Sequence, residues 1–385
     1  MTASASTPGM DTVPRMAKTF QVKSPLLLSL YGIIPLSFLI VLADYLFFGF
    51  QLRDKYLPNN PAALVMWAVI FNFPHIVSSM VTLADDEYIP FYKKRLTKAL
   101  LIIVISVLTV NILFPLALPG PAAMVTTLLF FAVFATYTMY HVLSQQFGIT
   151  MMLMQAKPGG RDYEIWRWLA TVAATSMYAM VFVRYNLEAV NIAGYTAYQL
   201  AQGLAGIFVA LAVIQGFRLS RQSKRELGSW YMYSNLAMLI ATYSFLLMGY
   251  GIFVIAIPRF VHDLTAFMIY SVHDQNRNRE VQHNYVYKYL SFLKIPPLIL
   301  CPILAIALAN FIECGSFLFD AWLGFGSVSE CAIQRFYTPA SAENALPQSM
   351  QLWLQIMFIC GFFHYYIEGF VWKRDSIHRH SISFT

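Results

Sequence analysis

Long apolar runs separated by short polar segments fill almost the whole chain, from residue 26 to residue 372. A run of about 20 apolar residues is long enough to cross the hydrocarbon core of a bilayer as a helix. Gly249 and Gly251 favour a turn that divides the longest run, and Pro258 is expected to kink the helix that follows. The pattern therefore predicts an all-α polytopic transmembrane bundle with ten spans: Leu26–Phe50, Pro61–Leu83, Ala99–Leu118, Pro121–Leu153, Ile165–Val183, Ala197–Phe217, Trp230–Met248, Gly251–Asp274, Ile295–Ile312 and Met350–Trp372.

Polar segments bound this predicted bundle at both ends. Residues 1–24 are small and polar and lack the basic start and short apolar core of a signal peptide, so we expect a disordered cytoplasmic tail. The transmembrane domain then covers residues 25–373 and includes an extracytoplasmic loop at 313–348. Residues 374–385 form a second cytoplasmic tail in this scheme.

Composition and charge support a membrane protein. The chain is 58% hydrophobic and 12% charged, whereas soluble domains carry roughly 25% charged residues. With both termini in the cytoplasm, 21 of the 26 Lys and Arg residues fall on the cytoplasmic side, as the positive-inside rule requires. The net charge of +7 therefore indicates anionic lipid as a partner and not nucleic acid. The five remaining basic residues are Arg53, Lys55, Arg184, Arg259 and Arg335.

The four cysteines fall into two classes. Cys314 and Cys331 lie in the predicted extracytoplasmic loop, where an oxidising compartment would let them pair. Two unpaired thiols are the alternative, and the sequence leaves both open. Cys301 and Cys360 lie within spans and are expected to be packing residues.

Five of the eight histidines fall within predicted spans: His75, His141, His262, His273 and His364. Ionisable groups at this depth are costly and usually face the interior of a bundle, where they have a function. A single one is also compatible with a hydrogen-bonded core histidine, but five together favour a shared site.

Depth within the membrane sharpens this expectation. With a rise of about 1.5 Å per residue, His75, His141 and His364 share one level on the cytoplasmic side of the span midpoints. His273 and Glu368 lie about one helical turn further towards the cytoplasm, at matching depth, and His262 lies just outside the centre. His364 and Glu368 are four residues apart, so they occupy one helix face and are able to ligate one metal ion.

Polar neighbours are candidates for supporting the histidines. Gln145 follows His141 by one turn, Asn72 and Ser79 flank His75, and Asp274 adjoins His273. Each could hold the free ring nitrogen of a metal-bound histidine. The alternative is ordinary hydrogen bonding between helices, which Asn, Gln and Ser form routinely in membranes.

Neutral imidazoles with one or two carboxylates suit Fe(II), and less specifically Zn, Mn or Cu. Thiolates do not belong to this set, which argues against an iron–sulfur centre, and the chain has no CxxCH motif for haem attachment. The sequence thus predicts a non-haem metal site in the inner half of the bundle.

Four motifs in chain order resemble those of the bacterial membrane-embedded β-carotene-cleaving oxygenases of the Brp/Blh type. These are "FPH" at Pro74-His75, "HVLSQQFG" from His141, "YSVHDQNRNRE" around His273, and "HYYIEGFVWK" from His364. The resemblance implies a bacterial inner membrane location, O₂ as cosubstrate and a carotenoid-like substrate. It also implies that His75, His141 and His364 ligate the metal, with the fourth ligand left open between His273 and His262.

Three functions are compatible with these residues. The first is a histidine-ligated non-haem iron oxygenase acting on a lipid-soluble unsaturated substrate, with Glu368 as ligand or base. The second is a proton- or metal-conducting transporter, in which Arg259, His262 and Asp263 would form the outer half of a path. The third is a non-catalytic membrane subunit with hydrogen-bonded histidines.

Overall fold

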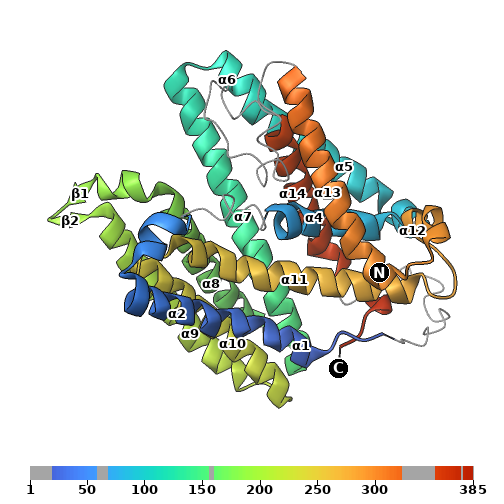
Figure 1. Cartoon of the computed structure of the whole chain (residues 1–385), viewed down its shortest axis with the longest axis horizontal. Helices are drawn as coiled ribbons and strands as arrows, with labels where there is room; N and C mark the ends of the chain where they lie inside the picture. The colour runs from blue at the N-terminus through green and yellow to red at the C-terminus, as the bar shows by residue number, and fades with distance from the viewer. Residues whose placement is uncertain (1–19, 59–67, 156–159, 323–351, 374–375, 385) are drawn as a thin grey trace, which may run out of the picture.

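The structure is a computed structural model and describes residues 20–58, 68–155, 160–322, 352–373 and 376–384 (Figure 1). Helices make up most of these ranges, turns and short loops join them, and the one paired-strand element described is a short hairpin of β1 (Asn191–Ile192) and β2 (Tyr195–Thr196). The all-α bundle that the sequence predicts is therefore confirmed for this part of the chain. Its α-helices are α1 Ser24–Ser29, α2 Ile33–Ala43, α4 Phe73–Leu83, α5 Tyr88–Leu108, α6 Phe114–Ala117, α7 Gly120–Met154, α8 Gly160–Glu188, α9 Ala197–Ser220, α10 Glu226–Leu247, α11 Gly251–Arg277, α12 Tyr285–Tyr289, α13 Pro297–Trp322 and α14 Leu352–Val371.

Short helical turns of other pitch join or extend these helices. The 3₁₀ turns are η1 Leu30–Gly32, η7 Ser291–Leu293 and η11 His378–Ser381. The π-helical turns are η2 Asp44–Phe48, η3 Leu52–Tyr56, η5 Ala68–Asn72 and η6 Thr109–Leu113. π-Helical turns are rare and often lie at functional sites; η5 leads directly into α4, which carries His75.

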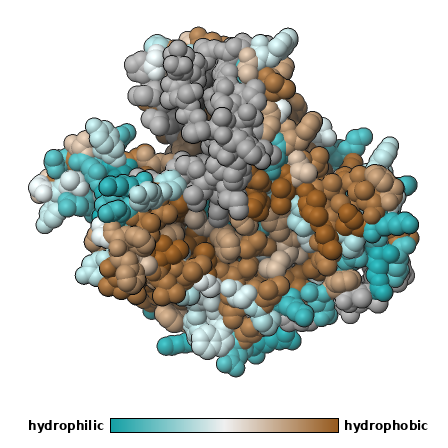
Figure 2. All heavy atoms as spheres, in the orientation of Figure 1, coloured by the Kyte–Doolittle hydropathy of each residue, from teal (hydrophilic) through white to brown (hydrophobic). Residues whose placement is uncertain are grey.

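Six of the described helical stretches are long and apolar enough to cross a membrane. Brown apolar atoms cover much of the face shown in Figure 2, as expected for a protein in contact with lipid. The chain is therefore a multi-pass membrane protein, and the total of ten spans stays a prediction. The six stretches are Ser24–Phe48, Tyr88–Ala117, Ala197–Ser220, Gly251–Arg277, Pro297–Trp322 and Leu352–Val371.

The predicted division at Gly249 is confirmed. α10 ends at Leu247 and α11 begins at Gly251, with Gly249 at φ +80°, a conformation that side-chain-bearing residues rarely adopt. Pro258 lies inside α11, which continues through it.

Some predicted helix ends are wrong because helices continue beyond the apolar run. α13 extends to Trp322, past the predicted end at Ile312. Its last turns connect to α14, since the Asp320 carboxylate accepts hydrogen bonds from the backbone N–H groups of Leu352 (2.9 Å) and Trp353 (3.4 Å) at the start of that helix. Asp320, in the part of α13 beyond the predicted end, thus caps the start of α14. The predicted partner of Cys314, Cys331, lies outside the described residues, as does most of the predicted 1–24 tail.

α11 is the central helix of the molecule. Figure 1 shows it running across the directions of α7, α13 and α14, and most of its residues are buried, including the charged Arg259, Asp263 and Asp274. Its C-terminal end meets both ends of the described chain, because Asn276 Nδ2 donates to the backbone oxygens of Phe20 (2.9 Å) and Ser381 (3.0 Å).

Candidate metal centre

Four histidines from four different helices meet in the interior beside α11. His75 comes from α4, His141 from α7, His262 from α11 and His364 from α14, and none is more than 6% exposed. Neighbouring ring centres form a closed circuit, with distances of 5.2 Å (His75–His262), 4.9 Å (His262–His141), 4.9 Å (His141–His364) and 5.1 Å (His364–His75). Imidazoles that are up to 289 residues apart in the sequence therefore share one buried cluster.

Glu368 joins this cluster from one turn further along α14. Its Oε2 lies 3.4 Å from His141 Nε2, and its Oε1 lies 3.8 Å from His364 Nε2. Tyr270 of α11 donates its hydroxyl hydrogen to Glu368 Oε1. The pair at positions 364 and 368 thus faces the same group of rings, as its spacing of one turn suggests.

Hydrogen bonds fix the protonation of two of the rings. His75 Nδ1 lies 3.0 Å from the carbonyl oxygen of Phe71, which can only accept, so Nδ1 carries the hydrogen. His364 Nδ1 lies 2.8 Å from Ser79 Oγ, whose own hydrogen is donated to Ile76 O at 2.7 Å. Both rings therefore present Nε2 as a bare lone pair, the form that binds a metal.

Five ring nitrogens of these histidines have no hydrogen-bond partner in the described part of the chain. They are Nε2 of His75, His141 and His364, and both ring nitrogens of His262. Leaving a buried polar atom unpaired costs about 1–3 kcal/mol. A histidine that only packs in a core would be satisfied, so this concentration of unpaired nitrogens fits a group of metal ligands.

The donor atoms group into two triads, His75/His262/His364 and His141/His364/Glu368, within each of which they lie within 4.8 Å of one another. His364 belongs to both triads but has only Nε2 to offer, because Ser79 occupies its Nδ1. A metal–nitrogen bond of about 2.0–2.1 Å puts neighbouring rings around one ion at a spacing close to that observed. The set therefore fits one ion better than two.

His273 lies apart from this cluster, although it is also on α11. Its Nε2 lies 3.1 Å from the Tyr88 hydroxyl and its Nδ1 lies 2.9 Å from Asp274 Oδ1. Eleven residues separate it from His262, which is about 16 Å along a helix. Equal depth with Glu368 does not bring the two together, because α11 crosses α14 instead of running beside it (Figure 1).

Most of the predicted supporting residues have other hydrogen-bond partners than expected. Gln145 makes no hydrogen bond to His141, and its Oε1 is unpaired in the described structure. Ser79 supports His364 of another helix and not His75 of its own. Asn72 accepts a hydrogen bond from Arg259 Nη2 at 2.9 Å, and Asp274 does contact His273, as its position next to it suggests.

Two polar residues near the rings were missed as members of the site. Tyr270 bonds Glu368, and Asp263 Oδ1 lies 3.4 Å from His75 Nδ1. Both lie on the face of α11 that also carries Arg259, at positions i, i+4 and i+11 of one helix, and this spacing was the available signal.

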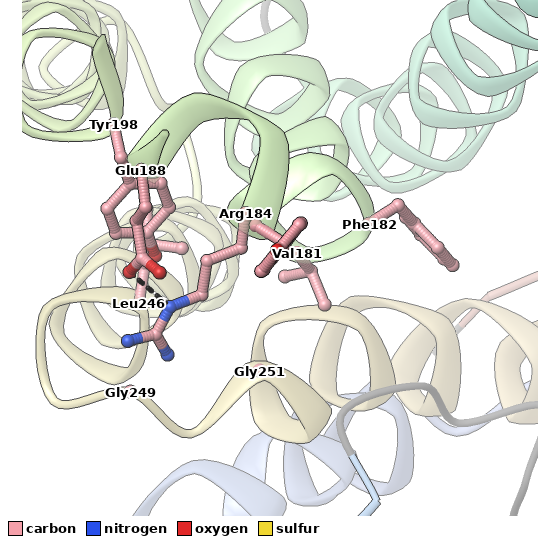
Figure 3. A pocket seen from close by; sticks show the side chains of 9 residues that line it. Val181, Phe182, Arg184, Glu188, Tyr198, Leu246, Gly249 and Gly251 are labelled. Atoms are coloured by element: carbon pink, nitrogen blue, oxygen red, sulfur yellow. Dashed lines mark hydrogen bonds and ion pairs between the residues drawn. The ribbon is translucent and has the colours of Figure 1, made fainter. Parts of the chain in front are cut away.

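A surface pocket of about 240 Å³ lies at the opposite end of α11 from the chain termini. It is lined by Arg184, Glu188, Tyr198, Gly249 and Gly251, among others, and Figure 3 shows the Arg184 guanidinium turned back onto Glu188 at 2.7 Å. It contains none of the clustered histidines, so the metal-ligand chemistry lies elsewhere.

Comparison with known proteins adds no assignment: no protein-family profile, curated protein or solved structure matches this chain.

Proposed function

We propose that this chain is a membrane-bound oxygenase whose His75, His141, His262 and His364 hold one non-haem Fe(II). Iron in this site would activate O₂ for oxidation of a lipid-soluble unsaturated substrate such as a carotenoid. The proposal takes His262 as the fourth ligand in place of His273, because both nitrogens of His273 are engaged in hydrogen bonds. One observation carries it: five unpaired ring nitrogens from four helices meet inside an apolar bundle.

Glu368 has two roles open to it in this site. Its Oε1 accepts the Tyr270 hydrogen, which fixes the carboxylate, while Oε2 faces His141 Nε2 at 3.4 Å. A carboxylate held at this edge of the rings is able to bind the metal or to accept a proton from a bound group. Burial of the whole cluster excludes water from the chemistry.

Aromatic rings between α7 and α14 support an unsaturated, apolar substrate. Tyr365 lies 4.5 Å from His141, ring centre to ring centre, and Phe134 lies 5.1 Å from Phe362 further along the same two helices. These rings are suited to contact a conjugated chain that enters from the lipid. The resemblance to the β-carotene-cleaving oxygenases points to the same class of substrate.

Metal analysis of detergent-purified protein tests the proposal. We expect one iron per chain in the wild type and a loss of at least tenfold in His262→Ala and His364→Ala, because each removes a ligand. His273→Ala is the matched control and should retain its iron. Iron that stays after both ligand substitutions, or that is lost equally in His273→Ala, would contradict the assignment.

Oxygen dependence tests the reaction itself. Purified iron-loaded protein should bleach an added polyene in air and not under anaerobic conditions, and the His364→Ala variant should bleach it in neither. Bleaching that continues without oxygen would exclude an oxygenase.

A proton- or metal-conducting transporter is the second candidate, supported by buried polar residues along the whole of α11. Arg259, Asp263, His273, Asp274 and Arg277 are each no more than 9% exposed, and they continue on both sides of the histidine cluster. Reconstituted vesicles distinguish the two functions: a transporter should move protons or metal ions down a gradient with no polyene and no oxygen present.

A further inference from the structure

We propose that Asp263 is a positioning residue for the metal site. Its carboxylate holds the outer nitrogen of His262, and Arg259, which Asn72 fixes in turn, lies beside that carboxylate. The proposal rests on the metal-binding function proposed above. It gives Asp263 and Arg259 of α11 and Asn72 of η5 a role in orienting the ring of His262.

His262 is the ring that needs such a partner. A metal-bound histidine almost always donates its second ring N–H to a carboxylate, a carbonyl oxygen or water. His75 uses Phe71 O and His364 uses Ser79 Oγ for this purpose, whereas neither nitrogen of His262 has a hydrogen bond in the described structure. Asp263 is the one acidic residue whose oxygen lies within 4 Å of it there, at 3.9 Å from Nε2.

Asp263 in turn needs hydrogen-bond donors. Its side chain is fully buried and neither of its oxygens accepts a hydrogen bond in the described structure. A buried carboxylate in this condition is unfavourable unless donors approach it. The groups near Oδ1 are His75 Nδ1 at 3.4 Å, Arg259 Nε at 3.6 Å and His262 Nε2 at 3.9 Å.

The position of Asp263 makes it a support and not a ligand. It lies on the Nδ1 side of His75, while the lone pair free for a metal is on Nε2 at the other edge of that ring. Binding of an ion through Nδ1 of His262 would leave the hydrogen on Nε2, which faces the Asp263 carboxylate. The distance of 3.9 Å is longer than a hydrogen bond, so we expect it to shorten when metal binds.

Arg259 lies beside the Asp263 carboxylate and is fixed in turn by Asn72. Arg259 is four residues before Asp263 on α11, and its Nη2 donates to Asn72 Oδ1 at 2.9 Å. Asn72 ends the π-helical turn η5, directly before the helix of His75. The line Asn72–Arg259–Asp263 therefore ties the two helices that carry His75 and His262 to each other at the site.

Cobalt binding to the full-length protein in detergent tests the proposed role of Asp263. We expect Asp263→Ala to raise the Co²⁺ dissociation constant about 10- to 100-fold, the usual effect of losing such a partner. Asp263→Asn should raise it less, because the amide oxygen still accepts the ring hydrogen. Both variants should shift the visible absorption of bound Co²⁺, which a general loss of packing at a distance would not do.

Asp44→Asn is the matched control. Asp44 is as buried as Asp263, but its carboxylate accepts from Tyr250 Oη at 2.8 Å and from the Leu52 N–H at 3.0 Å, away from the histidines. Its substitution should leave the Co²⁺ affinity and spectrum of the folded protein unchanged.

The outcomes separate this proposal from the one on which it rests. Wild-type Co²⁺ affinity and spectrum in Asp263→Asn and Asp263→Ala, with binding abolished in His262→Ala, would overturn the role of Asp263 alone. Unchanged binding in His262→Ala and His364→Ala would overturn the metal site. If Asp263→Ala does not fold, the isosteric Asp263→Asn decides, since it keeps the shape of the side chain.

Discussion

Ser78 and Ser79 are both buried on α4, and each donates its hydroxyl hydrogen to a backbone carbonyl three residues earlier. In the described part of the chain, Ser79 is also hydrogen-bonded to the Nδ1 of His364 at 2.8 Å. The bond to Ile76 turns the Ser79 lone pairs towards His364 and keeps that ring in its metal-binding form. The two equally buried serines therefore differ in the contact with His364.

Replacing Ser79 by alanine should weaken metal binding about 10- to 100-fold, because His364 loses the partner that orients it. Ser78→Ala removes an equally buried hydroxyl and should leave the affinity unchanged. Titration of the purified variants with Co²⁺ measures both. Equal affinities in the two variants would show that Ser79 does not orient His364.

At the residue scale, the sequence predicts His75, His141, His364 and Glu368 as site residues, which the structure places close together, and leaves the choice between His262 and His273 open. The choice depends on the direction in which α11 crosses the other helices, and residue spacing along one helix carries no information on that. The sequence predicts Ser79 as a neighbour of His75 because the two share a helix, whereas the helix that Ser79 faces cannot be identified from the sequence.

At the scale of elements, α10 approaches the end of α7 so closely that only glycine fits. A Cβ on Gly228 would lie 2.4 Å from both the Cα and the backbone N of Met154. Lys224 N also donates to Met154 O at 2.9 Å at this junction. Backbone atoms cannot move aside as a flexible side chain can, so the junction tolerates no larger residue.

Gly228→Ala should therefore destabilise the protein by about 1–3 kcal/mol or more through overpacking. Gly203→Ala on α9 is the control, since a Cβ there meets no atom within 4 Å, and alanine should stabilise that helix by about 0.5–1 kcal/mol. Thermal unfolding in detergent compares them. A Gly228→Ala variant as stable as the wild type would contradict the close approach.

The C-terminal segment is a second element, and it places the ring of His378 in the interior. His378 is 1% exposed and stacks on Tyr88 with ring centres 3.6 Å apart. Burial, with smaller contributions from His273 and Arg277, lowers the pKa of His378 to about 2. The undocked segment has the ordinary pKa of about 6.5, so it gains a proton first as the pH falls.

Docking of residues 376–384 should consequently be strongest above pH 6.5 and weaken below it, by up to about tenfold per pH unit. Hydrogen exchange of this segment at pH 7.5 and 5.5 measures the effect. His378→Phe keeps the stacking and cannot titrate, so its exchange at each pH supplies the reference. A wild type that follows His378→Phe at both pH values would show that His378 does not control docking.

At the scale of the whole molecule, both ends of the described chain lie on the same side. Val22 N donates to Ser383 O at 2.9 Å, and Val22 pairs with Phe384 in a parallel bridge. We therefore expect an even number of membrane crossings between them. Which side this is follows from the basic residues and stays a prediction.

We expect that side to be the cytoplasm. In a chain with its four native cysteines replaced, Ala193→Cys in the β1–β2 turn should react with a membrane-impermeant maleimide added outside intact cells. Gln222→Cys, in the exposed turn between α9 and α10, should react only after the membrane is opened. The reverse pattern would invert the orientation.

The sequence by itself determined the helical class, the membrane environment and the residue types available for chemistry, because apolar run length and the burial of ionisable groups are local properties of the chain. Only the tertiary structure decided that His262 and not His273 joins the cluster, that Ser79 supports a ring on another helix, and that Asp263 lies behind His75. These depend on how α11 crosses α4, α7 and α14. Helix crossings are set by side-chain packing over the whole bundle and are not encoded in any single span.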